Sequence, residues 1–288
     1  MTDPTTIPPA PAPAPVPAET DVRRTPLPIF TKALTDSWRS VLWWSIGLAA
    51  AVCLYLPLFP SLGGSDQMQR LIDSLPAELT RTLNYDQLGT APGYTQSTIF
   101  GLIGYLLLSM AAIGWGASAI GGDEESGQLE LTLTHGVTRV QVAVQRFLAL
   151  VVKVLILVLV TFVLILLWNA PAGLNLNGSY LLGTSLLLGG LGLVSGSAAL
   201  FCGALTGRRI WGIGGGAAVA VLGYVFNALG NQTPDLRWLH SLSPYYAAFG
   251  HSPLQNGADA WTLVLFYLAA LVLCAATAFT LRQRDVGV

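Results

Sequence analysis

The sequence predicts an all-α polytopic membrane protein with six transmembrane helices. Only 10% of its 288 residues are charged and 53% are hydrophobic, and the mean hydropathy is +0.60. An ordinary soluble domain is about 25% charged. The charges here are concentrated outside long apolar runs, several of which reach the roughly 20 residues that a helix needs to cross a hydrocarbon core about 30 Å thick.

The chain divides into a leader and a membrane domain. Residues 1–28 contain nine of the 17 prolines, so we expect a disordered Pro/Ala-rich leader, and it lacks the apolar region of a signal peptide. Residues 29–39 carry apolar side chains at helical spacing with Lys32 and Arg39, which predicts an amphipathic helix in the membrane interface. The domain then covers 29–288, with spans at about 40–59, 98–120, 147–168, 180–206, 210–229 and 260–281.

Two segments between spans have a pattern of their own. Residues 66–83 place leucine, isoleucine and methionine on one helical stripe, and Pro76 should bend or divide that helix. Residues 236–253 are aromatic and interrupted by proline and glycine. This pattern is typical of a short interfacial or re-entrant segment, because irregular backbone in a membrane must be shielded by protein or water.

The distribution of lysine and arginine predicts the orientation, because positively charged flanks stay cytoplasmic. With the amino terminus inside, the cytoplasmic side receives ten of these residues and the opposite side three. We therefore expect both termini in the cytoplasm. The ten are Arg23, Arg24, Lys32, Arg39, Arg139, Arg146, Arg208, Arg209, Arg282 and Arg284, and the three are Arg70, Arg81 and Arg237.

Small residues recur four apart in the fourth and fifth spans. Gly192 and Gly196 form one such pair, and Gly212 and Gly216 form another. Helices in lipid associate by the close approach of small residues, so these glycines predict tight packing between helices or across a dimer interface. Lining of a transport path, or flexibility during gating, is the alternative interpretation.

The sequence contains no recognisable catalytic constellation. Lys153 is the only ionisable residue inside a span, and we expect its long stem to carry the ammonium to the cytoplasmic surface rather than to serve transport. His135, His240 and His251 have no carboxylate or cysteine partner at a metal-like spacing, and the three cysteines lie apart in apolar runs. There is no phosphate-binding loop. We therefore predict no enzyme activity, no metal site and no cofactor in this chain, and no nucleic acid as a partner.

One charged segment separates the second and third spans: residues 121–139, GGDEESGQLELTLTHGVTR. We expect Gly121 and Gly122 to end the second span, and Asp123, Glu124 and Glu125 to occupy the first turn of a new helix, where carboxylates meet the positive end of the helix dipole. Gly136 should break this helix, and Thr138 can cap the next one. The segment thus predicts a short cytoplasmic helix along the membrane surface; an ordinary solvated connection is the alternative.

This segment resembles the loop after the second span of ABC-2 type permeases, with its glycine, its acidic cluster and its "xG(T/Q)LExLL" run before a small turn. Three other stretches are also similar to that family in the same order: TAPGYTQSTIF, LSPYYAAFGHSPLQNG and the closing LRQRDVGV. The resemblance covers most of the chain from about residue 29 onward.

The resemblance implies a coupling helix that docks on an ATPase subunit. By motif position, Glu124, Glu125 and Glu130 would be the acidic coupling residues, Leu129 and Leu131 would pack, and Arg139 would close the turn. Gly136 stands where the family often has proline, which leaves the geometry of the turn open. It also implies two permease halves, identical or different, each with an ABC-type ATPase that binds ATP and Mg²⁺ on a separate chain.

We therefore expect the permease subunit of an ATP-driven exporter, a multi-pass protein of a bacterial plasma (inner) membrane. The bacterial source is indicated by the content of alanine, glycine and leucine. A membrane scaffold or immunity-type protein that moves nothing is one alternative. A secondary carrier is another, although such a carrier normally places ionisable residues at mid-membrane.

Overall fold

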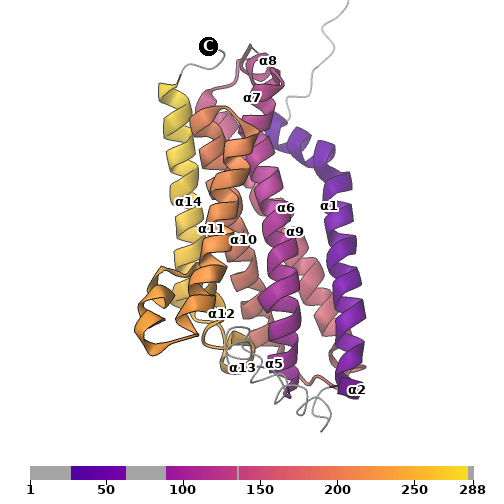
Figure 1. Cartoon of the computed structure of the whole chain (residues 1–288). Coiled ribbons are helices and arrows are strands. Elements are labelled where there is room, and N and C mark those ends of the chain that lie inside the picture. The colour runs from indigo at the N-terminus through magenta and orange to yellow at the C-terminus, as the bar shows by residue number, and fades with distance from the viewer. Residues whose placement is uncertain (1–26, 63–88, 135, 285–288) are drawn as a thin grey trace, which may run out of the picture.

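Six helices long and apolar enough to cross a membrane lie side by side in the computed structural model, which describes residues 27–62, 89–134 and 136–284 (Figure 1). The prediction of six spans is thereby confirmed, and the described part of the chain contains no strand. The spans are Pro28–Ser61, Ala91–Glu125, Arg139–Asn169, Gly178–Thr206, Arg209–Gly230 and Ala260–Gln283. The leader up to residue 26, the helix expected at 66–83 and His135 lie outside the described residues.

The first span includes the segment expected as a separate interfacial helix. Helix α1 runs without interruption over Pro28–Tyr55 and continues through the 3-10 turn Leu56–Leu58 into α2, Phe59–Leu62. Its first part crosses the end of the bundle before the helix turns to run along it (Figure 1). No proline follows Pro28 within α1, so nothing in the sequence forces a break between the two parts.

The beginning of α1 is held by a side chain from another helix. Leu27 at its N-cap provides no side-chain hydrogen bond. The backbone N–H groups of Ile29 and Phe30 instead donate to Oε1 of Gln145, at 3.0 and 3.1 Å. Because the first amides of a helix have no partner inside it, Gln145 satisfies two groups that would otherwise be unpaired.

The second span is helical over its whole length but not uniformly α-helical. It consists of α5 (Ala91–Thr95), a π-helical stretch (Gln96–Ile103), α6 (Gly104–Ala117), a second π-helical stretch (Ser118–Gly122) and α7 (Asp123–Glu125). The first π-helical stretch is bonded to the segment before the last span. The Gln96 amide donates to the carbonyl oxygen of Phe249 and accepts from the N–H of Leu254, and the Tyr245 hydroxyl donates to the carbonyl of Gly101 at 2.7 Å.

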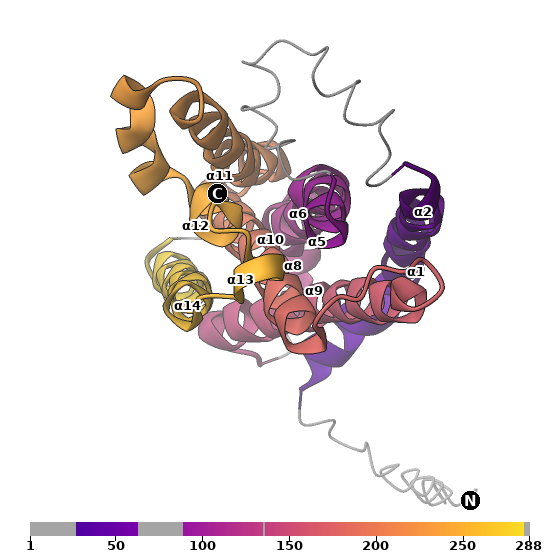
Figure 2. The ribbon, with the colours of Figure 1, turned by 90° about the horizontal axis from the view of Figure 1, so that it is seen from below.

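Helix α10 lies at the centre of the bundle. Viewed along the bundle, it is surrounded by α6, α9, α11 and α14 (Figure 2), and most of its apolar stretch is buried within the protein. The bounds of the long helices in this group are Arg139–Asn169 for α9, Gly178–Thr206 for α10, Arg209–Gly230 for α11 and Ala260–Gln283 for α14.

Glycines lie where α10 meets its neighbours. A Cβ atom placed on Gly196 would stand 2.9 Å from the carbonyl oxygen of Ala112 in α6, and one on Gly192 would collide with the side chain of Leu108. On α11, a Cβ at Gly212 would stand 2.8 Å from the carbonyl oxygen of Ala199, and one at Gly216 would stand 2.7 Å from that of Ser195. At these distances any side chain would force the helices apart.

The segment before the last span forms three short helices. They are a 3-10 helix at Pro234–Leu242, α12 at Pro244–Phe249 and α13 at Pro253–Asn256, and each has a proline in its first turn. The Ser243 hydroxyl caps α12 by accepting from the N–H of Tyr246, and it donates to the carbonyl of Gly223 in α11. The Tyr245 ring is buried against Tyr105 and Tyr224.

The structure places the start of α1, the α7–α8 connection and the end of α14 at one end of the bundle (Figure 1). That arrangement agrees with an even number of spans, while the assignment of this end to the cytoplasm stays a prediction. Large apolar side chains point outward along the bundle, for example Trp43, Leu54 and Val272, which are 70%, 63% and 60% exposed. Such a surface is suited to lipid rather than to water.

Candidate functional site

The charged segment between the second and third spans begins differently from the prediction. Gly121 and Gly122 do not end the second span, and Asp123–Glu125 continue it as α7 rather than opening a new helix. Gly121 stays inside the span because it packs against backbone: a Cβ there would stand 2.9 Å from the carbonyl carbon of Arg208. The helix ends at Glu125 with Ser126 at its C-cap, and the chain turns at Gly127, which has a φ of 71°.

The three carboxylates of α7 each contact a different helix. Asp123 forms an ion pair with Arg146 of α9. Glu124 accepts two hydrogen bonds from the Arg284 guanidinium just after α14, from Nη2 to Oε1 at 2.6 Å and from Nη1 to Oε2 at 3.1 Å. Glu125 accepts from the backbone N–H of Arg209, the first residue of α11, at 3.0 Å. We call Asp123, Glu124 and Glu125 the carboxylate cluster.

Glu125 acts as an N-cap for α11 from outside that helix. Arg208, the residue at the N-cap position, makes no capping bond with its side chain. A carboxylate at a helix N-terminus meets both an unsatisfied N–H group and the positive end of the dipole. The contact therefore stabilises the start of α11 and fixes it to the end of the second span.

The Glu124–Arg284 pair is enclosed by the connection between α10 and α11. Gly207 in that connection has a φ of 68°, and a Cβ there would stand 2.5 Å from Oε1 of Glu124 and would collide with the Arg284 guanidinium. Arg284 also donates to the carbonyl oxygen of Ala204 at 2.9 Å. The glutamate side chain is 11% exposed and the arginine side chain 28%, so this pair is largely shielded from solvent.

The turn before the third span has the cap that the sequence predicts. The Thr138 hydroxyl accepts from the N–H of Gln141, and the Gln141 side chain accepts in return from the N–H of Thr138, which completes a capping box. Gly136 has a φ of 74°, a conformation that proline cannot adopt because its ring fixes φ near −65°. The backbone conformation of this turn therefore differs from that of a turn with proline at this position.

Arg139 does not close the turn but reaches another helix. Its guanidinium donates to the carbonyl oxygen of Leu281 at 3.2 Å and to that of Arg284. Both acceptors lie at the end of α14, whose last carbonyls have no partner within the helix. Arg139 thus joins the beginning of α9 to the end of α14.

Helix α8, Gln128–Thr134, is the short helix expected between the two spans. Leu129 anchors it and is only 2% exposed, whereas the side chain of Leu131 is 64% exposed rather than packed on the bundle. Glu130 is exposed as well. One side of α8 therefore rests on the protein and the other faces outward at the end of the bundle (Figure 1).

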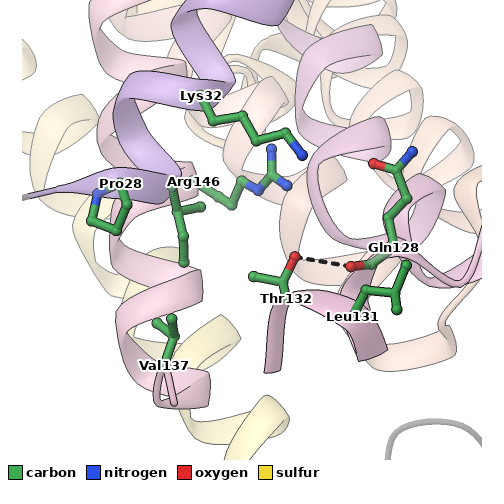
Figure 3. Close-up of a pocket in the computed structure, with 8 residues that line it drawn as sticks. Pro28, Lys32, Gln128, Leu131, Thr132, Val137 and Arg146 are labelled. Carbon is green, nitrogen blue, oxygen red and sulfur yellow. Dashed lines mark hydrogen bonds between the residues drawn. The ribbon is translucent and has the colours of Figure 1, made fainter. Parts of the chain in front are cut away.

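A groove of about 580 Å³ separates α8 from the beginning of α1 (Figure 3). Lys32 and Arg146 extend from one wall in the same direction with their charged ends close together, and the Thr132 hydroxyl donates to the carbonyl oxygen of Gln128 on the opposite wall. The lining residues are Pro28, Ile29, Lys32, Gln128, Leu131, Thr132, Val137 and Arg146. The beginning of α1 and the short helix α8 thus line the two sides of one groove.

Sequence reasoning missed Gln145, Gly207 and the partners of the carboxylate cluster. Arg146, Arg209 and Arg284 were counted only for orientation, yet all three lie on the same side of the predicted topology as the cluster. For the Asp123–Arg146 and Glu124–Arg284 pairs, opposite charges on one side of the predicted topology are the signal that could have indicated them. The contact of Glu125 with the backbone N–H of Arg209 has no such signal.

Comparison with known proteins agrees with the resemblance in the sequence. A family model described as ABC-2 family transporter protein matches residues 27–286, a range that includes every residue the structure describes. A search among curated proteins found no match. The family match and the six apolar helices make this chain a multi-pass membrane protein and a component of a transporter. The chain belongs to the ABC-2 family of transporter proteins.

Proposed function

We propose that this chain is the permease subunit of an ATP-driven exporter in a bacterial plasma membrane, and that a separate ABC-type ATPase docks on α8 and the beginning of α1. The observation that carries the proposal is the way in which α8 is held on the bundle. It is fixed to the bundle through Leu129, it is connected directly to two spans, and its other side is open to a partner. ATP and Mg²⁺ would be bound by that partner.

The structure divides the acidic residues that the resemblance groups together. Glu124 and Glu125 are occupied by Arg284 and by the start of α11, so their role is to hold the helices that move. Glu130 and Leu131 are exposed on α8, so we assign to them the direct contact with the ATPase. Motion of the ATPase would then reach the spans through Leu129 and the carboxylate cluster.

ATPase stimulation tests this assignment. The full chain is co-expressed with the ATPase that co-purifies with it, and hydrolysis is measured in the reconstituted complex for Glu130→Lys and Leu131→Glu. Both variants are expected to insert normally and to lose most of the stimulation. Gln283→Lys, which adds a charge to an exposed position at the end of α14, is the control and should retain it.

Two results would contradict the proposal. One is full stimulation by both α8 variants, which would remove α8 from the contact. The other is a stable complex that contains no ATPase, which would favour the scaffold function over transport.

Pairing with a second permease half, identical or different, is part of the same proposal. An apolar groove of about 390 Å³ between α6 and α11, lined by residues that include Met110 and Val221, supports a contact on this side. Small residues on α11 leave room for close approach. The mass of the complex in native mass spectrometry should correspond to two permease chains and two ATPases, and a single permease chain in the active complex would contradict it.

A further inference from the structure

Lys153 is enclosed in the protein instead of reaching the surface. Its side chain is 7% exposed, and its ammonium lies 5.3 Å from the centroid of the Trp115 ring. Within the described residues, Lys153 makes no hydrogen bond and no ion pair. Burying a cation whose donors have no acceptor is costly. The Trp115 ring and, at longer range, the Asp123 carboxylate act on this charge, but neither accepts a hydrogen bond from the ammonium.

Lys153 lines a cavity of about 270 Å³ between α1, α6 and α9. This volume is well above the roughly 30 Å³ that one water molecule occupies in the liquid. Lys32 and Asp36 border it from α1, and Arg146 borders it from α9. Seven residues, about 10 Å along the helix axis, separate Arg146 from Lys153, and helical side chains point back toward the N-terminus. The two cationic groups therefore approach the cavity from the same helix.

A second donor at this cavity also lacks an acceptor. The Nε atom of Arg146 is buried and has no hydrogen-bond partner, although the same guanidinium pairs with Asp123 through Nη2. The charged residues that border the cavity are Lys32, Arg146 and Lys153 against Asp36 and Asp123, which leaves one positive charge in excess. Two unsatisfied cationic donors and an excess positive charge indicate an anion site.

We propose that this cavity binds a phosphate group, carried either by an anionic phospholipid or by a soluble phosphate. A phosphate offers several acceptor oxygens, which could serve the ammonium of Lys153, Nε of Arg146 and the ammonium of Lys32 together. Basic pockets between membrane helices are sites for lipid headgroups. The cavity lies between the first, second and third spans and shares Lys32, Gln128 and Arg146 with the groove beside α8, so its occupant would brace α1 against α9.

Thermal stability of the delipidated full chain in a neutral detergent tests the site. Tryptophan fluorescence is followed during heating with phosphatidylglycerol, with diacylglycerol of the same acyl chains, with inorganic phosphate, and with chloride at equal ionic strength. We expect phosphatidylglycerol to raise the melting temperature and diacylglycerol not to. Removing one cation should weaken the apparent affinity about fivefold. Lys153→Met removes the buried charge, and Lys32→Gln removes an exposed one and leaves the core unchanged.

Arg282→Gln is the matched control, because Arg282 is an exposed cation at the same end of the bundle and does not border the cavity. It should keep the wild-type response. If inorganic phosphate stabilises the wild type and this effect is lost in Lys153→Met, the site takes a soluble phosphate; if only phosphatidylglycerol does so, it takes a lipid. The proposal is overturned if neither ligand stabilises the wild type, or if both lysine variants respond as the wild type does, since water alone would then fill the cavity.

Discussion

The contact between Glu124 and Arg284 allows a quantitative prediction. Exposed ion pairs contribute about 0.2–1 kcal/mol, and removing one partner of a fully buried pair costs about 3–5 kcal/mol. This pair is bidentate, with side chains 11% and 28% exposed. We therefore expect a coupling energy of about 1–2 kcal/mol. For a protein of this size, each 1 kcal/mol lowers the melting temperature by about 2–4 °C, so Glu124→Gln should lower it by about 2–8 °C.

A double-mutant cycle isolates the pair from other effects of the substitutions. Glu124→Gln, Arg284→Gln and the double variant are purified in the same detergent, and their unfolding is measured by tryptophan fluorescence. The second substitution should lower the free energy of unfolding much less when the first is already present. Gly207→Ala perturbs the same pair from the connection between α10 and α11, because its Cβ would stand 2.5 Å from Oε1 of Glu124. We expect this substitution to lower the free energy of unfolding by about 1–2 kcal/mol, because a residue with a Cβ atom is strained in the left-handed conformation of this position.

Additive losses of stability in the two single variants would contradict an interaction between Glu124 and Arg284. If the losses from the two single variants sum to that of the double variant within about 0.5 kcal/mol, the two side chains do not interact. Wild-type stability of Gly207→Ala would independently contradict the close enclosure of the pair.

Three further predictions address other contacts. Gly196→Val should separate α10 from α6, because even a Cβ would stand 2.9 Å from the carbonyl of Ala112, and a lower melting temperature in detergent measures this. Gln145→Leu should expose the start of α1 to faster hydrogen exchange, because two amides lose their acceptor. Burial lowers the pKa of His240, which stacks on Tyr246. The unfolded chain then binds more protons below about pH 6.5. Stability should therefore fall as the pH drops through this range, and His240→Gln should abolish that fall.

The spans, the existence of the short helix α8 and the Thr138 cap were predictable because each depends on local sequence. Apolar runs determine where a helix can cross lipid, and a threonine followed three residues later by Gln141 indicates a capping box. The segment expected as an interfacial helix illustrates the limit of this reasoning. Its amphipathic pattern is real, yet no residue between it and the first span breaks the helix, so the two parts form one element.

The role of the carboxylate cluster was not predictable from local pattern. A row of acidic residues before a leucine-containing helix has the composition of a helix N-terminus, and the prediction followed that composition. The partners lie 23, 84 and 160 residues away along the chain, where sequence spacing carries no information on contact. The exposure of Leu131 could not be predicted either, because a seven-residue helix has too few turns to define its buried side.

The two π-helical stretches of the second span have a consequence for insertions and deletions. Each wide turn accommodates residues beyond the α-helical repeat, and one residue corresponds to a rotation of about 100° around the helix axis. Deleting a single residue within Gln96–Ile103 could restore a regular α-helix there, but it would rotate one side of the stretch relative to the other. Either the face that holds Gln96 against Phe249 and Leu254 or the face that packs on α10 would then point the wrong way. The number of residues in this span therefore determines which way its faces point, as well as whether it can cross the membrane.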